Sequence, residues 1–174
     1  ALKGGVKYDY MPILTGMQGI GKSTFLTNLG RDWFTDSLTT FDSKTGAELI
    51  QGKWIAEVGE LAALKKHEIE VVKQFITRTS DRYRAAYGRK AEDRKRRCVF
   101  FGTSNEDEFL NDITGNRRFL PIACGACKPG LNVWEDMPRL VDQLWAEAVV
   151  MHKQGTPIHL SAAEEKTAER VREQ

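Results

Sequence analysis

The stretch from Met11 to Leu29 brings together the residue types of a phosphate-binding site. Gly16 is followed by four residues and then by Gly21, Lys22 and Ser23, which is the spacing G-x-x-x-x-G-K-[ST]. An apolar segment precedes this loop and an amphipathic segment follows it, as the motif requires of a strand and a helix. Such a turn aims backbone N–H groups and the positive end of a helix dipole at one point. We therefore predict a loop that binds a nucleoside triphosphate, rather than a glycine-rich turn without a ligand.

Each residue of this loop has an expected task. Lys22 supplies a positive charge to the β and γ phosphates, and the Ser23 hydroxyl ligates the Mg²⁺ that bridges them. Gly19 and Gly21 allow backbone conformations that a side chain would forbid. The expected nucleotide-binding residues are Gly16, Met17, Gln18, Gly19, Ile20, Gly21, Lys22, Ser23 and Thr24.

Two glutamates follow the next apolar run. Residues 54–58 are nearly all apolar, which is typical of a strand buried on both faces of a parallel sheet, and Glu57 and Glu60 lie at its end. A carboxylate there can hold the metal ion, and a second can polarise the attacking water. We expect Glu57 to hold the metal and Glu60 to be the base. For each residue the alternative is that it only caps the following helix.

A third strand is predicted over residues 98–105, and it ends at Asn105. Ligands of such sheets lie at the carboxyl ends of the strands, so Asn105 should reach the edge that carries the phosphate loop. There it would orient the water or touch the γ phosphate, unless it merely begins a turn.

Paired arginines, Arg117 and Arg118, stand just before a predicted strand over residues 119–122. They are either surface charge or, in a ring-forming ATPase, groups that reach the γ phosphate of a neighbouring subunit.

The segment 78–97 differs from the rest in charge, because it holds nine Lys or Arg and three acids in a chain of net charge +2. Basic residues interleaved with tyrosines can contact a phosphate backbone and stack on bases, and the alternative is a solvated surface. We expect a basic insertion, in hairpin or loop form, that contacts DNA through Arg82, Tyr83, Arg84, Tyr87, Arg89 and Lys90.

The remaining patterns complete an α/β fold, a P-loop NTPase with a mainly parallel central sheet flanked by helices. Residues 31–34 should finish a helical segment and 38–41 should form a short strand, and residues 1–10 should pack near the adenine side of the site. Helices are predicted over 44–50, 68–78 and 136–153, the last capped by Asp136 with Pro138 in its first turn. A capping box at Ser161 opens a charged C-terminal helix or tail over 160–174.

Composition fits a single P-loop ATPase domain over residues 1–174. Hydrophobic residues make up 41% and charged residues 29%, with no apolar run near 18 residues and no secretory signal, so we expect a cytoplasmic protein without a membrane partner. The chain begins with Ala1, and we expect it to be a fragment of a longer protein. Its three cysteines are too few for a disulfide framework.

Five motifs in order give the chain a resemblance to the virulence-associated E (VirE) family of ATPase domains, found in phages and mobile islands and related to superfamily-three helicases. They are G-M-Q-G-I-G-K-S-T, W-I-A-E-V-G-E-L, T-R-T-S-D-R-Y-R-A-A-Y-G-R, R-R-C-V-F-F-G-T-S-N and F-L-N-D-I-T-G-N-R-R-F, and the similarity runs from about Tyr10 to Met151. The resemblance implies an AAA+-like core that binds ATP and Mg²⁺, with Asn105 as the polar sensor and Arg117 or Arg118 acting across a subunit interface.

The resemblance also implies a function. The chain would be a Mg²⁺-dependent ATPase and replicative DNA helicase of a phage or mobile element, in a bacterial cell or phage-infected host. Expected partners are single-stranded or forked DNA, further copies in a homo-oligomeric ring, expected to be a hexamer, and a primase or another replication protein. Many relatives place their two acids side by side, whereas Val58 and Gly59 separate Glu57 from Glu60, so the division of roles stays open. The alternatives are an ATP-switched DNA-binding initiator that does not unwind and, less favoured, a small-molecule kinase.

Overall fold

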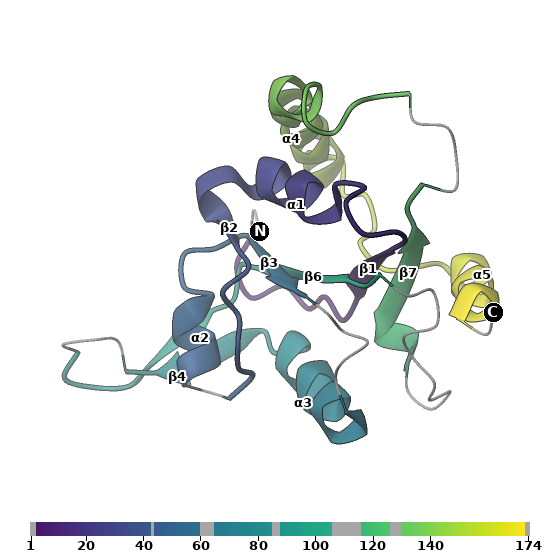
Figure 1. Cartoon of the computed structure of the whole chain (residues 1–174). Helices are drawn as coiled ribbons and strands as arrows, with labels where there is room; N and C mark the ends of the chain where they lie inside the picture. Colours follow the sequence, from purple (N-terminus) through teal and green to yellow (C-terminus); the bar gives the residue numbers. More distant parts are fainter. Residues whose placement is uncertain are drawn as a thin grey trace.

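A five-stranded parallel sheet lies at the centre of the molecule (Figure 1). The computed structural model describes residues 3–42, 44–59, 65–84, 88–105, 116–125 and 130–172. In spatial order the strands are β2 (Phe34–Thr35), β3 (Ile55–Val58), β6 (Val99–Thr103), β1 (Met11–Thr15) and β7 (Phe119–Ala123). The strand that precedes the phosphate loop is therefore interior, with β6 between it and β3.

Helices cover both faces of this sheet and one of its edges (Figure 1). They are α1 (Lys22–Gly30), α2 (Thr45–Leu49), α3 (Lys66–Ile76), α4 (Met137–Lys153) and α5 (Ala162–Arg172), with short 3₁₀ turns η1 (Arg31–Trp33) and η3 (Asn116–Arg118). Helices α1 and α4 lie above the sheet in the view of Figure 1, α2 and α3 lie below it, and α5 lies beside β7. The expected α/β architecture with a parallel sheet is confirmed.

Strand alternation decides which side chains face which helix layer. Ile55 packs with Leu26 of α1 in the upper core, whereas Ala56 and Val58 pack with α3 in the lower core. Because successive strand side chains point to opposite faces, Glu57 shares the face of Ile55 and points toward α1. A buried carboxylate is thereby directed at the start of the helix that follows the phosphate loop.

The basic segment folds as an antiparallel hairpin of β4 (Ser80–Tyr83) and β5 (Glu92–Lys95), separate from the central sheet. It extends outward beside α2 (Figure 1). The hairpin form of the expected insertion is confirmed.

Of two local predictions near the first helix, one was wrong and the other failed only at its last residue, since the helical segment after α1 does continue through η1 (Arg31–Trp33). Residues 38–41 form no strand, although Leu38 and Phe41 do pack into the lower core from a loop. The edge strand is instead β2, which begins at Phe34, where the end of a helical segment was expected. Its two residues pair with Ile55 and Ala56 of β3. A strand this short has no periodicity to recognise.

Helix starts were predicted better than their capping contacts. Helix α4 begins at Met137 with Pro138 in its first turn, as expected, but the Asp136 carboxylate accepts a hydrogen bond from the Asn132 backbone N–H at 2.6 Å instead of capping the helix. At α5 the capping box is confirmed, since Ser161 N–H donates to the Glu164 carboxylate at 2.7 Å. In the part of the chain that the structure describes, no helix is long and apolar enough to cross a membrane.

Candidate functional site

The phosphate loop connects β1 to α1 and is enclosed by the segment that follows β7. Gly16 has φ 130°, and a Cβ there would lie 2.6 Å from the Cys124 carbonyl oxygen. Gly21 has φ 94°, and a Cβ there would lie 2.4 Å from Val133 Cγ1. Both positions therefore require glycine, because the backbone is left-handed and the space for a side chain is taken.

Lys22 is the first residue of α1, and its ammonium group is turned across the loop. Its side chain is nearly buried, and Nζ donates hydrogen bonds to the carbonyl oxygens of Gly16 at 2.7 Å and Met17 at 3.0 Å. It also donates to Asn105 Oδ1 at 3.0 Å, just beyond the end of β6. The structure thus brings the predicted phosphate-binding lysine and the predicted polar sensor into direct contact.

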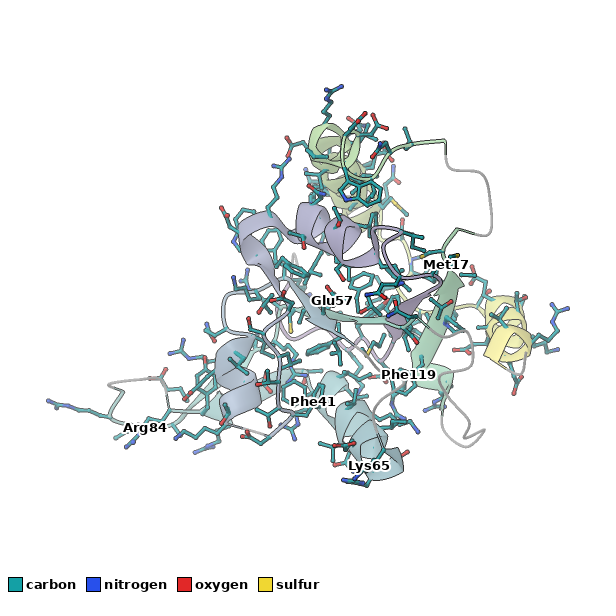
Figure 2. All side chains as sticks on the ribbon, viewed as in Figure 1. Met17, Phe41, Glu57, Lys65, Arg84 and Phe119 are labelled. Carbon is teal, nitrogen blue, oxygen red and sulfur yellow. The ribbon has the colours of Figure 1, made fainter. Side chains whose placement is uncertain are left out.

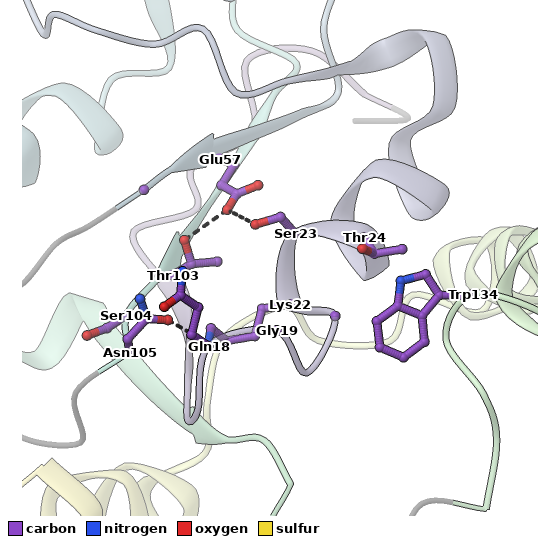
Figure 3. A pocket seen from close by; sticks show the side chains of 12 residues that line it. Gln18, Gly19, Lys22, Ser23, Thr24, Glu57, Thr103, Ser104, Asn105 and Trp134 are labelled. Atoms are coloured by element: carbon purple, nitrogen blue, oxygen red, sulfur yellow. Dashed lines mark hydrogen bonds between the residues drawn. The ribbon is translucent and has the colours of Figure 1, made fainter.

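Glu57 lies 5% exposed on β3, and one of its carboxylate oxygens joins two elements (Figure 3). Oε1 accepts hydrogen bonds from Ser23 Oγ at 2.6 Å and from Thr103 Oγ1 at 2.8 Å. Oε2 is buried with no hydrogen-bond partner among the described residues. A buried carboxylate whose bonded partners are neutral hydroxyls retains the capacity to bind a cation.

The donor set at this point fits Mg²⁺. That ion prefers oxygen ligands and is usually held by one or two carboxylates together with substrate phosphates, rather than by a cage of protein ligands. Ser23 and Glu57 supply a hydroxyl and a carboxylate within hydrogen-bonding distance of each other. Within the described ranges, no group of three or more His, Cys, Asp or Glu comes together.

These groups open into one cavity of about 500 Å³. Its lining includes Gln18, Gly19, Gly21, Lys22, Ser23, Thr24, Glu57, Gly59, Thr103, Ser104, Asn105 and Trp134. The volume lies within the range of small-molecule sites. Three strand ends predicted to meet, those carrying Lys22, Glu57 and Asn105, therefore do meet.

Sequence reasoning missed four residues of this cavity, Gly59, Thr103, Ser104 and Trp134, and two of them have side chains that bear on its chemistry. Thr103 stands two positions before Asn105 in the strand, and its contact with Glu57 could have been suspected only once β6 was known to lie beside β3. Trp134 lies three residues before α4 and carries no local sequence signal, because its 55% exposed side chain reaches the cavity only once this turn rests on the phosphate loop.

A family model for the virulence-associated protein E-like domain matches residues 1–174. The chain belongs to that family. The predicted resemblance is thus confirmed over the whole length. No curated protein matches the chain.

Two solved structures of the NrS-1 C-terminal region (305–718), both apo, are similar to this family member in fold. One has 17% sequence identity and a TM-score of 0.54, and covers 78% of this chain and 36% of that region. The other, the A form, has 19% identity and a TM-score of 0.51, and covers 78% of this chain and 33% of that region. The chain therefore spans about a third of the NrS-1 region.

Next to the loop of this virulence-associated protein E-like domain lies Cys124, whose side chain is partly buried. The Cys124 backbone N–H donates to the Thr15 carbonyl at 2.8 Å at the end of β1. Partial burial raises the pKa of the Cys124 thiol, and the nearby Lys22 charge opposes that rise only in part. The raised pKa favours the neutral form of this thiol.

Arg117 and Arg118 lie at the opposite edge of the sheet from the phosphate loop. They belong to η3 immediately before β7, and β7 runs parallel to β1, so they stand at the amino ends of these strands. Five residues of strand extend about 16 Å, which separates them from the loop at the carboxyl end.

The surroundings of the two arginines differ. Burial and a hydrogen bond to Glu165 raise the pKa of Tyr10, and the nearby Arg117 charge opposes this rise. Arg118 Nε is buried with no hydrogen-bond partner in the described ranges.

The first ten residues were expected to pack near the adenine side of the site, and that role stays a prediction, whereas their described contacts are with other segments. Gly5 N–H donates to the Arg96 carbonyl at 2.9 Å, and Lys7 Nζ donates to the Thr77 carbonyl at 2.9 Å. These partners precede β6 and follow α3, so the described part of this segment runs along the amino edge of the sheet.

The hairpin has a buried base and an exposed tip, and this changes one predicted DNA contact. Tyr83 is only 5% exposed, its hydroxyl donates to Gln51 Oε1, and the Arg94 guanidinium lies over its ring. Burial raises the pKa of Tyr83, so it stays a neutral anchor. Its ring is therefore not available for stacking on a base, a correction to the prediction.

Fewer positive charges of the hairpin are exposed to contact DNA than the number of its basic residues suggests. Arg96 is buried against Asp81, and Arg82 stands 3.6 Å from Asp93. Arg84, Arg89 and Lys90 are exposed near the tip, and Figure 2 shows Arg84 pointing away from the body of the molecule.

Two predicted site residues, Glu60 and Tyr87, lie outside the described residues. The roles proposed for them stay predictions.

Proposed function

We propose that this chain is a Mg²⁺-dependent ATPase domain whose cycle of ATP hydrolysis is coupled to DNA binding and to translocation or unwinding, as part of a phage or mobile-element replicative helicase. The convergence of Lys22, the Ser23–Glu57 pair and Asn105 on one cavity carries the proposal. These are the groups that phosphoryl transfer from a triphosphate uses for positioning and charge neutralisation. Membership of the virulence-associated protein E-like family supports it.

The residues of the loop take defined roles in this proposal. Lys22 is held across the loop by two carbonyls and Asn105, so its charge faces the β and γ phosphates without rearrangement of the helix. When bound, Mg²⁺ neutralises charge between those phosphates, and Ser23 and Glu57 are the residues that would hold it. Thr103 fixes the Glu57 carboxylate from the neighbouring strand.

The attacking water is assigned to the side of the cavity that Asn105 borders. Asn105 lies beyond the end of β6 in contact with Lys22, where an amide can orient water or touch the γ phosphate. Glu60 is the proposed base and Glu57 the proposed metal ligand, and exchange of these two roles is the alternative.

A neighbouring copy is proposed to complete the site. Arg117 and Arg118 stand at the amino edge of the sheet, about one strand length from the loop of their own chain. In a ring, proposed to be hexameric, an arginine from one subunit would instead approach the γ phosphate of the next and offset charge in the transition state.

DNA is assigned to the tip of the hairpin. Arg84, Arg89 and Lys90 are exposed there, and such a cluster binds a phosphate backbone without regard to sequence. The hairpin base is anchored to the core, so movement of the core during the ATP cycle would be transmitted to the tip.

The central test is ATP turnover with and without single-stranded DNA, compared between the wild-type chain and Lys22→Ala. Removing the charge at the phosphates should abolish tight ATP binding and turnover, whereas Lys153→Ala, an exposed lysine at the end of α4, should behave as wild type. Unchanged ATP affinity in Lys22→Ala contradicts the proposal.

Strand displacement on forked DNA then separates a motor from a switch. A helicase turns over ATP faster with DNA and releases the paired strand. ATP-dependent DNA binding without displacement favours the initiator instead.

A mixing experiment tests the ring. Arg117→Ala blended with Lys22→Ala should regain part of the activity if the arginine serves a neighbour's site, and the same blend with Arg118→Ala identifies which arginine acts. No recovery in either blend contradicts action between subunits.

A further inference from the structure

Trp134 is an exposed aromatic residue at the mouth of the phosphate-loop cavity. It is 55% exposed and lines the same cavity as Lys22, Ser23 and Thr24. Exposure of so large an aromatic surface is unfavourable unless something covers it. The other three tryptophans contact one another, since Trp33, although 47% exposed, stacks on Trp54 at 4.8 Å and Trp54 meets Trp145 edge-on at 5.5 Å.

Contacts with the phosphate loop fix where Trp134 stands. A Cβ on Gly21 would lie 3.3 Å from Trp134 Cζ2 and 3.4 Å from Cη2, so the indole ring borders the turn that precedes Lys22. Val133, its neighbour, approaches the same glycine still more closely. The turn before α4 therefore rests directly on the phosphate loop.

The backbone of this turn is held by its own hydrogen bonds. The Asn132 side-chain carbonyl accepts from the Trp134 backbone N–H at 2.9 Å, and the Asp136 carboxylate accepts from the Asn132 backbone N–H at 2.6 Å. Met137, the first residue of α4, is buried and ties the turn to the core. An aromatic face presented from such a turn loses little conformational freedom when a planar ligand covers it.

The order of groups along the cavity gives a bound nucleotide a direction. Figure 3 shows Asn105 at one end, Lys22 between, and Trp134 at the other end beyond Thr24. Lys22 serves the β and γ phosphates, and Asn105 lies on the side of the terminal phosphate. The base of the nucleotide must then leave the loop toward Thr24 and Trp134.

We infer that Trp134 is the platform on which the nucleobase of the bound triphosphate stacks. This inference rests on the proposed nucleotide-binding function and adds the residue that holds the base. Stacking uses the face of the ring and does not read base edges, so the site should bind ATP, GTP, CTP and UTP with affinities within about tenfold of one another.

The experiment compares ATP with inorganic tripolyphosphate, which has the phosphates but no base, by calorimetry at fixed Mg²⁺. Trp134→Ala should lose about tenfold or more in ATP affinity and leave the affinity for tripolyphosphate unchanged. Trp134→Phe should recover most of the ATP affinity. Leu131→Ala is the matched control, since Leu131 is an apolar residue of the same turn, 63% exposed, and does not line the cavity.

Fluorescence of the wild-type chain gives a second measurement. ATP should quench tryptophan emission, and tripolyphosphate should not, because only the base covers the indole ring.

Three outcomes separate the two proposals. If Trp134→Ala binds ATP as tightly as the wild type, the platform is wrong and the nucleotide site stands. If this variant loses ATP and tripolyphosphate equally, Trp134 only supports the loop and the platform is again wrong. If the wild type binds neither compound, the proposed function itself fails.

Discussion

Two buried carboxylates in this molecule have opposite surroundings. Asp81, at the base of the hairpin, is 6% exposed and both of its oxygens accept hydrogen bonds from the Arg96 guanidinium. Glu57, in the central sheet, is 5% exposed and bonds through one oxygen to two hydroxyls, while its other oxygen has no partner among the described residues. Arg96 neutralises the Asp81 carboxylate, whereas among the described residues the Glu57 carboxylate has only neutral hydroxyl partners.

The difference separates a structural charge from a functional one. Arg96 also donates to the Phe75 carbonyl and lies over the rings of Phe75 and Phe100, so this neutralised pair connects the hairpin to the lower core. A buried carboxylate without a counter-charge lowers the free energy of unfolding, and binding of a cation offsets this loss. Replacing each carboxylate with its amide, in Asp81→Asn and Glu57→Gln, therefore tests whether one charge is structural and the other functional.

Asp81→Asn should have the largest effect, and that effect should be on stability. Removing the negative charge leaves Arg96 buried without a counter-charge, which costs about 3–5 kcal/mol of the free energy of unfolding. Urea denaturation measures the loss. Asp93→Asn is the control, because its partner Arg82 is exposed and a surface pair contributes only about 0–1 kcal/mol. Equal losses in the two variants would show that the buried pair does not anchor the hairpin.

Glu57→Gln should show the reverse pattern. Glutamine keeps the length of the side chain and can still accept from Ser23 and Thr103, and it removes a buried charge, so the free energy of unfolding should change by less than about 1 kcal/mol. Loss of the carboxylate should lower ATP turnover by about 100-fold at saturating Mg²⁺. A variant that loses stability but keeps its turnover would make Glu57 a second structural charge.

The positive charges at the hairpin tip extend the comparison to exposed residues, whose replacement should affect DNA binding and not stability. Replacing Arg84, Arg89 and Lys90 with glutamine should lower the affinity for single-stranded DNA by roughly 10–100-fold and reduce the salt dependence, since each lost phosphate contact lowers the slope by about 0.7. Stability should stay within about 0.5 kcal/mol of the wild type. Titrations at several salt concentrations measure both quantities. An unchanged slope would mean that the tip is only a solvated surface.

Sequence patterns were sufficient where the information is local. The motif spacing that identifies the phosphate loop lies within the short stretch from Gly16 to Ser23. Apolar runs bounded by polar residues predicted β3 and β6 with their ends. Because all strands of this sheet are parallel, locating the strand ends was enough to predict that Lys22, Glu57 and Asn105 meet.

Patterns failed where a contact joins distant segments. In β4 the buried side chains are Asp81 and Tyr83, which no hydrophobic pattern would select, and their burial depends on Arg96 and Gln51. The count of positive charges in segment 78–97 consequently included Arg96, although its side chain is buried in the core. Trp134 was missed for the same reason, since its position over Gly21 exists only after the chain has crossed the sheet.

Thr103→Val gives the smallest and most specific effect. Valine has a similar shape but cannot donate a hydrogen bond to Glu57 Oε1. The carboxylate therefore keeps the hydrogen bond from Ser23 and loses the one from β6. Turnover should fall by no more than about tenfold, as expected when a residue that orients a metal ligand is removed, and the Mg²⁺ concentration for half-maximal activity should rise. Magnesium titrations of ATPase activity measure both. A fall in turnover without any change in Mg²⁺ dependence would place Glu57 in the role of the base and leave the metal to another residue.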